Sequence, residues 1–137
     1  MTYLLDTNVL SEAIKPKPHA GVLARLKDPE TVFSTAAIVW LELWQGYHQL
    51  PTGQRKSRVG EFLEGLRLSN MGILPYTQAC AETQAQFASS LAATGRVLPL
   101  VDSMIAATAV TFDLTLVSRN VADFNCVPGL KLENWFV

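Results

Sequence analysis

The stretch LLDTNVLSE, residues 4–12, contains a change from strand to helix around one acidic residue. The apolar run at residues 3–5 predicts a buried strand, and Asp6 follows it directly. A helix is predicted immediately afterwards by the spacing of Val9, Leu10, Ala13 and Ile14. Asp6 has two interpretations on these residues alone, because Asp, Asn and Thr commonly cap helices and a carboxylate at a strand end can also bind a metal ion.

The composition indicates one globular domain. The chain has 137 residues, of which 49% are hydrophobic and 17% are charged, and its formal net charge is -1. A charge this small argues against a strongly basic nucleic-acid binder, but it allows an enzyme whose acids share one cleft. We expect a single domain over residues 1–137.

Cysteine usage and hydropathy set the expected compartment. Cys80 and Cys126 lie far apart without C-x-x-C spacing, so neither a zinc site nor a disulfide framework is predicted. No run approaches about 18 apolar residues, and the N-terminus lacks the basic start and apolar run of a signal peptide. We therefore expect a cytoplasmic protein with no membrane attachment.

Short strands alternate with helices along the rest of the chain. Helices are clearest where apolar residues recur at positions 37, 40, 41, 44 and 47. The pattern predicts an α/β fold with a mostly parallel central sheet of four to five short strands. These strands are expected at residues 3–5, 31–34, 72–74 and 115–117, with an edge strand in the tail at 132–137.

Acids lie near the predicted ends of several strands. Asp6 ends the first strand, Glu42 lies in the early turns of the helix after the second, and Asp102 opens the helix that leads into the strand at 115–117. That strand runs into a segment with a fourth acid, Asp123. Because parallel strands direct their carboxyl ends to one edge, these acids are expected to converge there.

Clustered carboxylates call for a counterion, since two charges about 4 Å apart repel by roughly 4 kcal/mol at an effective dielectric near 20. Oxygen ligands favour Mg²⁺, with Mn²⁺ as an alternative, and such an ion can activate water to hydrolyse a phosphodiester. Each acid also has a simpler explanation. Asp6 and Asp102 can cap helices, Glu42 can face solvent and Asp123 can belong to a turn, and spacing alone does not decide between the two.

Several motifs, taken in order, make the chain resemble the PIN-domain nucleases, and among them the VapC-type toxins of toxin–antitoxin pairs. The resemblance covers nearly the whole chain. It rests on LLDTNVLSE at 4–12, ELWQG at 42–46, VDSMIAATA at 101–109, LVSRNVADF at 116–124 and LKLENW at 130–135.

This resemblance implies a PIN-like three-layer α/β/α fold. It also implies a Mg²⁺- or Mn²⁺-dependent endoribonuclease that acts as a toxin, hydrolyses RNA with metal-activated water and forms a homodimer. A cognate antitoxin is expected to block its acidic site.

Carried over by position, the resemblance makes Asp6, Glu42 and Asp102 the expected metal ligands. The family often has a fourth acid directly after its T-R or S-R pair, where this chain has Asn120. We include Asn120 in the expected catalytic set as a departure, for which Asp123 can compensate. The expected consequence is weaker binding of a second metal ion, not loss of activity.

A second departure is Val39, where relatives commonly have Thr or Ser. Val39 removes a capping partner for Glu42, and Thr35 is expected to cap a longer helix instead.

Further polar residues are expected around the metal site. Thr7 and Asn8 would orient Asp6 or a water molecule, and Ser118 would bond a water on the metal or the scissile phosphate. The basic residues have two interpretations, as RNA phosphate ligands or as solvated surface; they are Arg119, Arg96, Lys15 and Lys17.

Trp40 and Trp44 are one helical turn apart. Such a pair most often belongs to a core or a subunit interface, and the functional alternative is a groove that receives a partner helix.

Two other functions remain open. An aspartate-based phosphotransfer domain also has Asp at a strand end, but a dehalogenase-type second Asp would stand where Asn8 is, and a receiver-type Lys would stand where Ser118 and Arg119 are. A non-catalytic PIN-type RNA-binding or scaffold protein is favoured only by Asn120.

Overall fold

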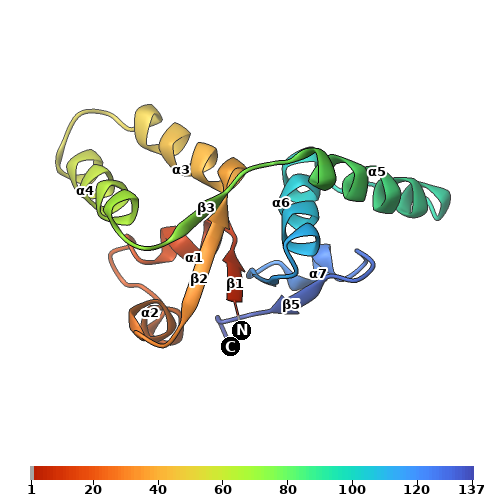
Figure 1. Ribbon diagram of the computed structural model, residues 1–137. Coiled ribbons are helices and arrows are strands. Elements are labelled where there is room, and N and C mark those ends of the chain that lie inside the picture. The colour runs from red at the N-terminus through yellow and green to blue at the C-terminus, as the bar shows by residue number, and fades with distance from the viewer. Residues whose placement is uncertain (1) are drawn as a thin grey trace.

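A single five-stranded sheet forms the centre of the computed structural model, which describes residues 2–137 (Figure 1). Its strands are β1 (Thr2–Leu5), β2 (Val32–Ala36), β3 (Gly72–Leu74), β4 (Thr115–Val117) and β5 (Lys131–Glu133). The strand order is β3-β2-β1-β4-β5, and every neighbouring pair is parallel. The predicted parallel sheet is therefore confirmed, and the tail adds an edge strand as expected, although that strand ends at Glu133 and does not reach residue 137.

Helices cover both faces of this sheet. Figure 1 shows the first four helices on one side and the last three on the other, which confirms the three-layer α/β/α fold. The described residues form α1 (Thr7–Glu12), α2 (Ala20–Lys27), α3 (Ala37–Gln49), α4 (Gln54–Leu68), α5 (Gln78–Ala93), α6 (Leu100–Thr111) and α7 (Val121–Phe124).

The division of helices between the faces follows from the strand order. From β1 through β2 to β3 the chain moves in one direction across the sheet, and from β3 through β4 to β5 it moves in the other. Because crossovers between parallel strands are right-handed, the two directions put their helices on opposite faces. The adjacent strands β1 and β4 are the point where this changes, because the connections that leave them go to opposite faces, and in open α/β sheets ligands bind at such a point.

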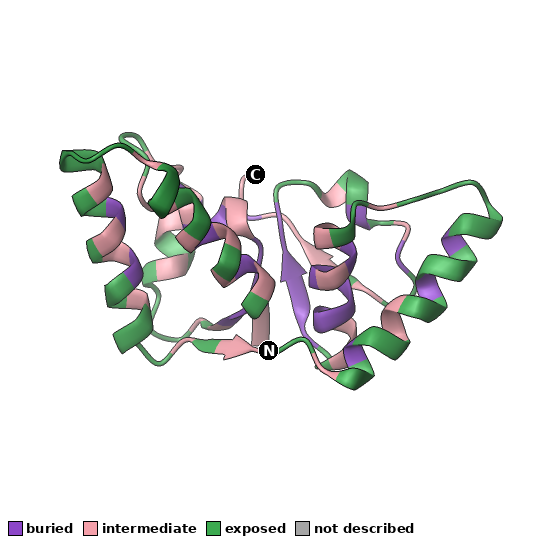
Figure 2. Cartoon of the chain, turned by 90° about the horizontal axis from the view of Figure 1, so that it is seen from above, coloured by how far each residue is buried: buried purple, intermediate pink, exposed green. Residues whose placement is uncertain are grey.

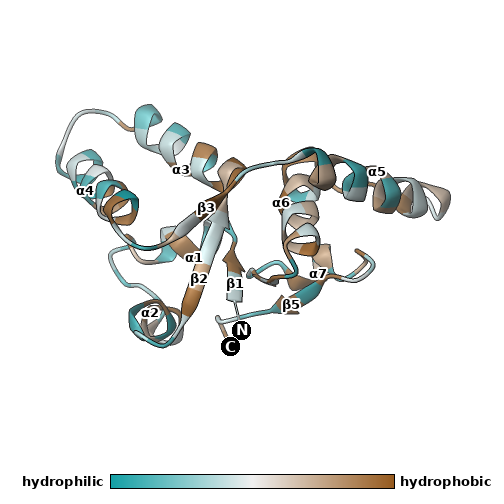
Figure 3. Ribbon diagram, in the orientation of Figure 1, coloured by the Kyte–Doolittle hydropathy of each residue, from teal (hydrophilic) through white to brown (hydrophobic). Residues whose placement is uncertain are grey.

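The core lies on both faces of the central strands. Leu4, Leu5, Leu116 and Val117 are fully buried, as expected for strands covered by helices on both sides. In the view from above, buried purple residues lie along the strands and on the inward faces of the helices (Figure 2). Figure 3 shows hydrophobic brown residues on the central strands and α6, whereas α4 and α5 carry hydrophilic stretches.

Two local predictions were wrong. Thr35 does not cap α3, because it lies within β2 and its hydroxyl donates to the Leu5 carbonyl at 2.8 Å. The N-cap of α3 is Ala36, which makes no side-chain capping bond. Asp102 does not open α6 either, because that helix begins at Leu100 and Asp102 lies within its first turn.

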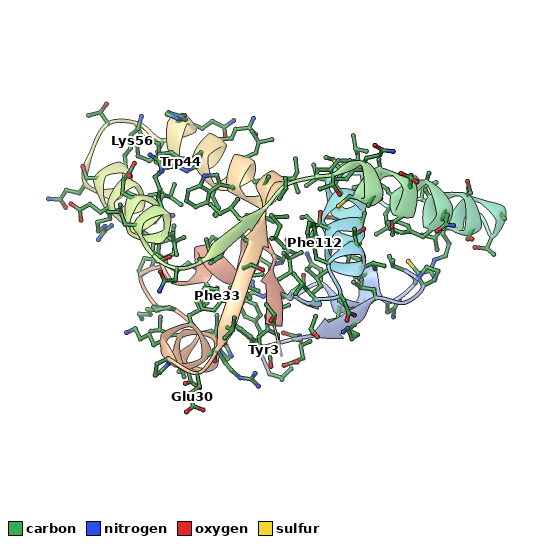
Figure 4. The ribbon with its side chains drawn as sticks, viewed as in Figure 1. Tyr3, Glu30, Phe33, Trp44, Lys56 and Phe112 are labelled. Atoms are coloured by element: carbon green, nitrogen blue, oxygen red, sulfur yellow. The ribbon has the colours of Figure 1, made fainter. Side chains whose placement is uncertain are left out.

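The tryptophan pair packs within the chain. The ring centroids of Trp40 and Trp44 are 5.9 Å apart in an edge-to-face arrangement, and both rings pack against the core. Figure 4 shows Trp44 between α3 and α4. The guanidinium of Arg67 on α4 lies 5.0 Å from the Trp44 ring and pairs with Glu64 at 3.2 Å. Core packing is therefore the role that the structure supports for this pair.

None of the helices within residues 2–137 is long and apolar enough to cross a membrane.

Candidate metal centre

Asp6 lies at the carboxyl ends of the adjacent strands β1 and β4, from which the chain leaves toward opposite faces of the sheet. It follows β1 directly, and its backbone N–H donates to the Val117 carbonyl of β4 at 2.9 Å. It is also the N-cap of α1, because its Oδ1 accepts the backbone N–H of Thr7 at 2.8 Å. The two interpretations of Asp6 are thus compatible, since the capping bond uses Oδ1 and leaves most of the carboxylate's lone pairs for other partners.

The other carboxylate oxygen of Asp6 is held from β4. Ser118 donates its hydroxyl to Oδ2 at 2.7 Å, and the side-chain amide of Asn8 approaches the same oxygen at 3.4 Å. Asp6 is only 5% exposed, and this burial raises the pKa of its carboxyl, with a further rise from the nearby Glu42 charge. The bonds from Ser118 and Thr7 act in the opposite direction.

Asn8 contacts Asp6 as expected, whereas Ser118 does not face a water or phosphate site. Ser118 is fully buried and its hydroxyl proton goes to Asp6, so it is not available to the scissile phosphate. The Oδ1 of Asn8 also accepts the backbone N–H of Arg119 at 3.2 Å.

Glu42 reaches the site from the second turn of α3. Its Oε1 accepts the Thr7 hydroxyl at 2.6 Å, so one residue orients two acids: Thr7 holds Asp6 with its backbone and Glu42 with its side chain. Thr7 was expected to orient only Asp6 or a water. Val39 is fully buried in the core, so α3 is positioned by packing and not by a capping box.

Asp102 joins these acids from the first turn of α6. Burial raises the pKa of its carboxyl, and the charges of Asp6, Glu42 and Asp123 raise it further. Asp6, Glu42 and Asp123 therefore lie close enough to Asp102 for their charges to act on its carboxyl. Asp123 also lines one cavity with Asp102, of about 390 Å³, together with Arg96 and Cys126.

Asn120 lies at the start of α7 without capping it. Its side chain is exposed and makes no capping bond, while its backbone N–H donates to the Ser118 hydroxyl oxygen at 3.0 Å. This bond closes the turn from Ser118 to Asn120 on the same Ser118 hydroxyl that donates to Asp6.

The sequence and the fold match those of known proteins. The family model described as PIN domain matches residues 3–128. The chain belongs to the PIN domain family. Among curated relatives, this PIN domain is 37% identical over 136 residues to toxin FitB of Neisseria gonorrhoeae, with 96% of this chain and 97% of that protein covered.

Two further comparisons agree with the first. The tRNA(fMet)-specific endonuclease VapC of Shigella flexneri is 31% identical to this PIN domain over 135 residues, with 98% of each chain covered. The crystal structure of FitAcB from Neisseria gonorrhoeae superposes with a TM-score of 0.87 at 32% identity and covers 98% of each chain.

The donor set of this PIN domain fits a hard divalent cation. Asp6, Glu42 and Asp102 offer carboxylate oxygens, which Mg²⁺ and Mn²⁺ prefer. In this structure, no three or more His, Cys, Asp or Glu side chains among residues 2–137 lie in an arrangement that could hold a metal ion. Carboxylates that repel one another are expected to stand apart until a cation neutralises them.

The basic residues divide into two groups. Arg96 lines the cavity beside Asp102, and Lys17 is exposed. Arg119 and Lys15 are both paired with Glu12, at 3.5 and 3.0 Å. The sequence analysis missed Glu12, because the only signal at its position is a charge on a short helix, and such charges usually face solvent.

We expect a pH dependence of stability from Asp102 in metal-free protein. Its pKa is above the ordinary value of 3.8 when folded, so between these two values the folded state binds more protons than the unfolded state. Stability then falls as pH rises through this window. The Asp102→Asn variant should be more stable than wild type near pH 7, and the difference should shrink as pH falls to about 4.

Thermal melting in EDTA across this pH range measures the difference. Asp113→Asn is the matched control, since Asp113 is 90% exposed at its side chain and pairs with Lys131 on the surface. A difference between wild type and Asp102→Asn that stays constant with pH would show that the Asp102 carboxyl carries no such penalty.

Proposed function

We propose that this PIN domain is a divalent-metal-dependent endoribonuclease that acts as the toxin of a toxin–antitoxin pair. The observation that carries the proposal is the convergence of Asp6, Glu42 and Asp102 at the carboxyl ends of the adjacent strands β1 and β4. The names of two relatives, toxin FitB and a tRNA-specific endonuclease VapC, support it. Mg²⁺ is the proposed ion, with Mn²⁺ able to replace it.

When bound, this ion would polarise a phosphoryl oxygen and lower the pKa of an attacking water. The chain's own residues position the acids for that task. Thr7 fixes Asp6 and Glu42 relative to each other, and Ser118 holds Asp6 from the neighbouring strand. Arg96, on the wall of the cavity beside Asp102, is placed to bind an RNA phosphate.

Partners and location are part of the same proposal. A nuclease toxin needs an inhibitor in the cell that makes it, so we include a cognate antitoxin that covers the acidic site. We also include a homodimer and a cytoplasmic location, where the RNA substrate is.

Cleavage of total RNA by purified, antitoxin-free protein tests the proposal. We expect discrete fragments with Mg²⁺ or Mn²⁺ and intact RNA with EDTA, because the acids cannot activate water without the cation. RNA that stays intact under every metal condition, with protein shown to be folded, would contradict the proposal. That outcome would favour the non-catalytic RNA-binding alternative, for which Asn120 in place of a fourth acid is the specific observation.

A further inference from the structure

Glu12, the last residue of α1, is a buried carboxylate that the proposed reaction does not use. It is 4% exposed, and its Oε2 accepts the His19 backbone N–H at 2.8 Å. Its Oε1 lies 3.0 Å from the Lys15 ammonium and 3.5 Å from the Arg119 guanidinium. The His19 bond and these two cations lower the pKa of Glu12, so the buried carboxyl keeps its charge.

Arg119 is engaged on two sides. One of its terminal nitrogens faces Glu12, and its guanidinium carbon lies 4.0 Å from the centroid of the Phe136 ring. This stacking is a cation–π contact, which fixes the plane of the guanidinium as well as its charge. The side chain is half exposed, and its guanidinium has one ionic partner and one aromatic partner within the chain.

The backbone of Arg119 belongs to the turn that holds Asp6. Ser118, immediately before it, donates to Asp6, and Asn120, immediately after it, donates its N–H to the Ser118 oxygen. The Arg119 N–H itself donates to Asn8, which also contacts Asp6. A shift of Arg119 would therefore move two of the groups that orient Asp6.

We propose that Arg119 is a positioning residue and not an RNA phosphate ligand. Glu12 and Phe136 clamp its guanidinium, and the clamp holds the Ser118–Asn120 turn against Asp6. This role rests on the proposed function, because its effect is read at the metal-binding carboxylate. Loss of such an indirect support typically costs about 10–100-fold in metal affinity or activity.

The test compares Glu12→Gln and Arg119→Ala with Arg67→Ala. The control is matched because Arg67 also pairs with a glutamate and stacks on an aromatic ring, but it lies on α4 away from the acids. The measurements are kcat and KM for RNA cleavage, and Mn²⁺ binding by calorimetry without RNA. Both test variants should lower kcat and Mn²⁺ affinity about 10-fold or more with KM unchanged, and Arg67→Ala should change neither.

The opposite pattern would overturn the positioning role. If Arg119 binds phosphate, Arg119→Ala will raise KM and leave Mn²⁺ affinity unchanged, and Glu12→Gln will free the guanidinium and lower KM. If Glu12→Gln does not fold, Phe136→Leu replaces it, because that variant removes the stacking face and keeps the carboxylate.

The two readouts separate this role from the proposed function. Wild-type protein that cleaves no RNA, with Mn²⁺ affinity lowered in both test variants, would contradict the nuclease and support the clamp. Cleavage by wild type, with unchanged kcat and Mn²⁺ affinity in the variants, would support the nuclease and overturn the clamp. Without cleavage or any change in Mn²⁺ affinity, both fail.

Discussion

The Asp6→Asn variant is expected to lose RNA cleavage by at least about 100-fold without losing stability. Residues that only support a ligand cost about 10–100-fold when replaced, so removal of the ligand's charge should cost more. Stability should stay the same or rise, because burial raises the pKa of Asp6 and its charge is therefore unfavourable in the folded state.

The amide of the variant can also keep the bonds to Thr7 and Ser118, although it loses the longer contact with Asn8. Its oxygen can accept the Thr7 N–H, and the Ser118 hydroxyl can rotate to accept from the amide nitrogen. Initial cleavage rates in Mg²⁺ and melting temperatures in EDTA measure the two effects. Asp113→Asn is again the control, since the Asp113 backbone has a positive φ of 55°, which Asn tolerates. Cleavage by Asp6→Asn within a few-fold of wild type would rule out Asp6 as a metal ligand.

The second large effect is on stability. Phe124 on α7 is fully buried, and Phe124→Ala should lower the free energy of unfolding by about 3–5 kcal/mol through lost burial and a residual cavity. Phe112→Ala is the matched control, because Phe112 is 37% exposed at the end of α6 and should cost much less. Urea unfolding of both variants in EDTA measures the difference.

This variant also tests how the site depends on α7. Asp123 precedes Phe124 on the same short helix, so a loosened helix should reduce metal affinity as well as stability. Equal losses of stability in the two variants would mean that α7 is not anchored by Phe124.

Local patterns were sufficient to predict the layers and the convergence of the acids. The run from Tyr3 to Ile14 shows an apolar strand followed by apolar residues at helical spacing. In a parallel sheet, the topology alone then directs Asp6, Glu42 and Asp102 to one edge. The family resemblance rests on the same segments. The metal-binding roles of these acids stay predictions until cleavage and metal binding are measured.

The supporting contacts could not be predicted in the same way. Thr7 bonds Glu42 across 35 positions, and Ser118 bonds Asp6 across 112, so neither follows from a repeat in the sequence. Thr35 illustrates the difficulty, because a Thr hydroxyl at this position can either cap the following helix or bond a neighbouring strand. In the folded chain it donates to the Leu5 carbonyl of β1. Glu12 likewise finds its partners His19 and Arg119 in other segments of the chain.

The central position of β1 has a consequence for the order of folding. The first strand of the chain pairs with β2 early in the sequence, but its other neighbour, β4, begins only at Thr115. Contacts between residues so far apart form late, because closing a long loop costs entropy before the contacts that offset this cost are made. A chain emerging from the ribosome therefore carries Asp6 and Glu42 long before it carries Asp102 and Ser118, and the acidic site stays incomplete until these later segments have been synthesised.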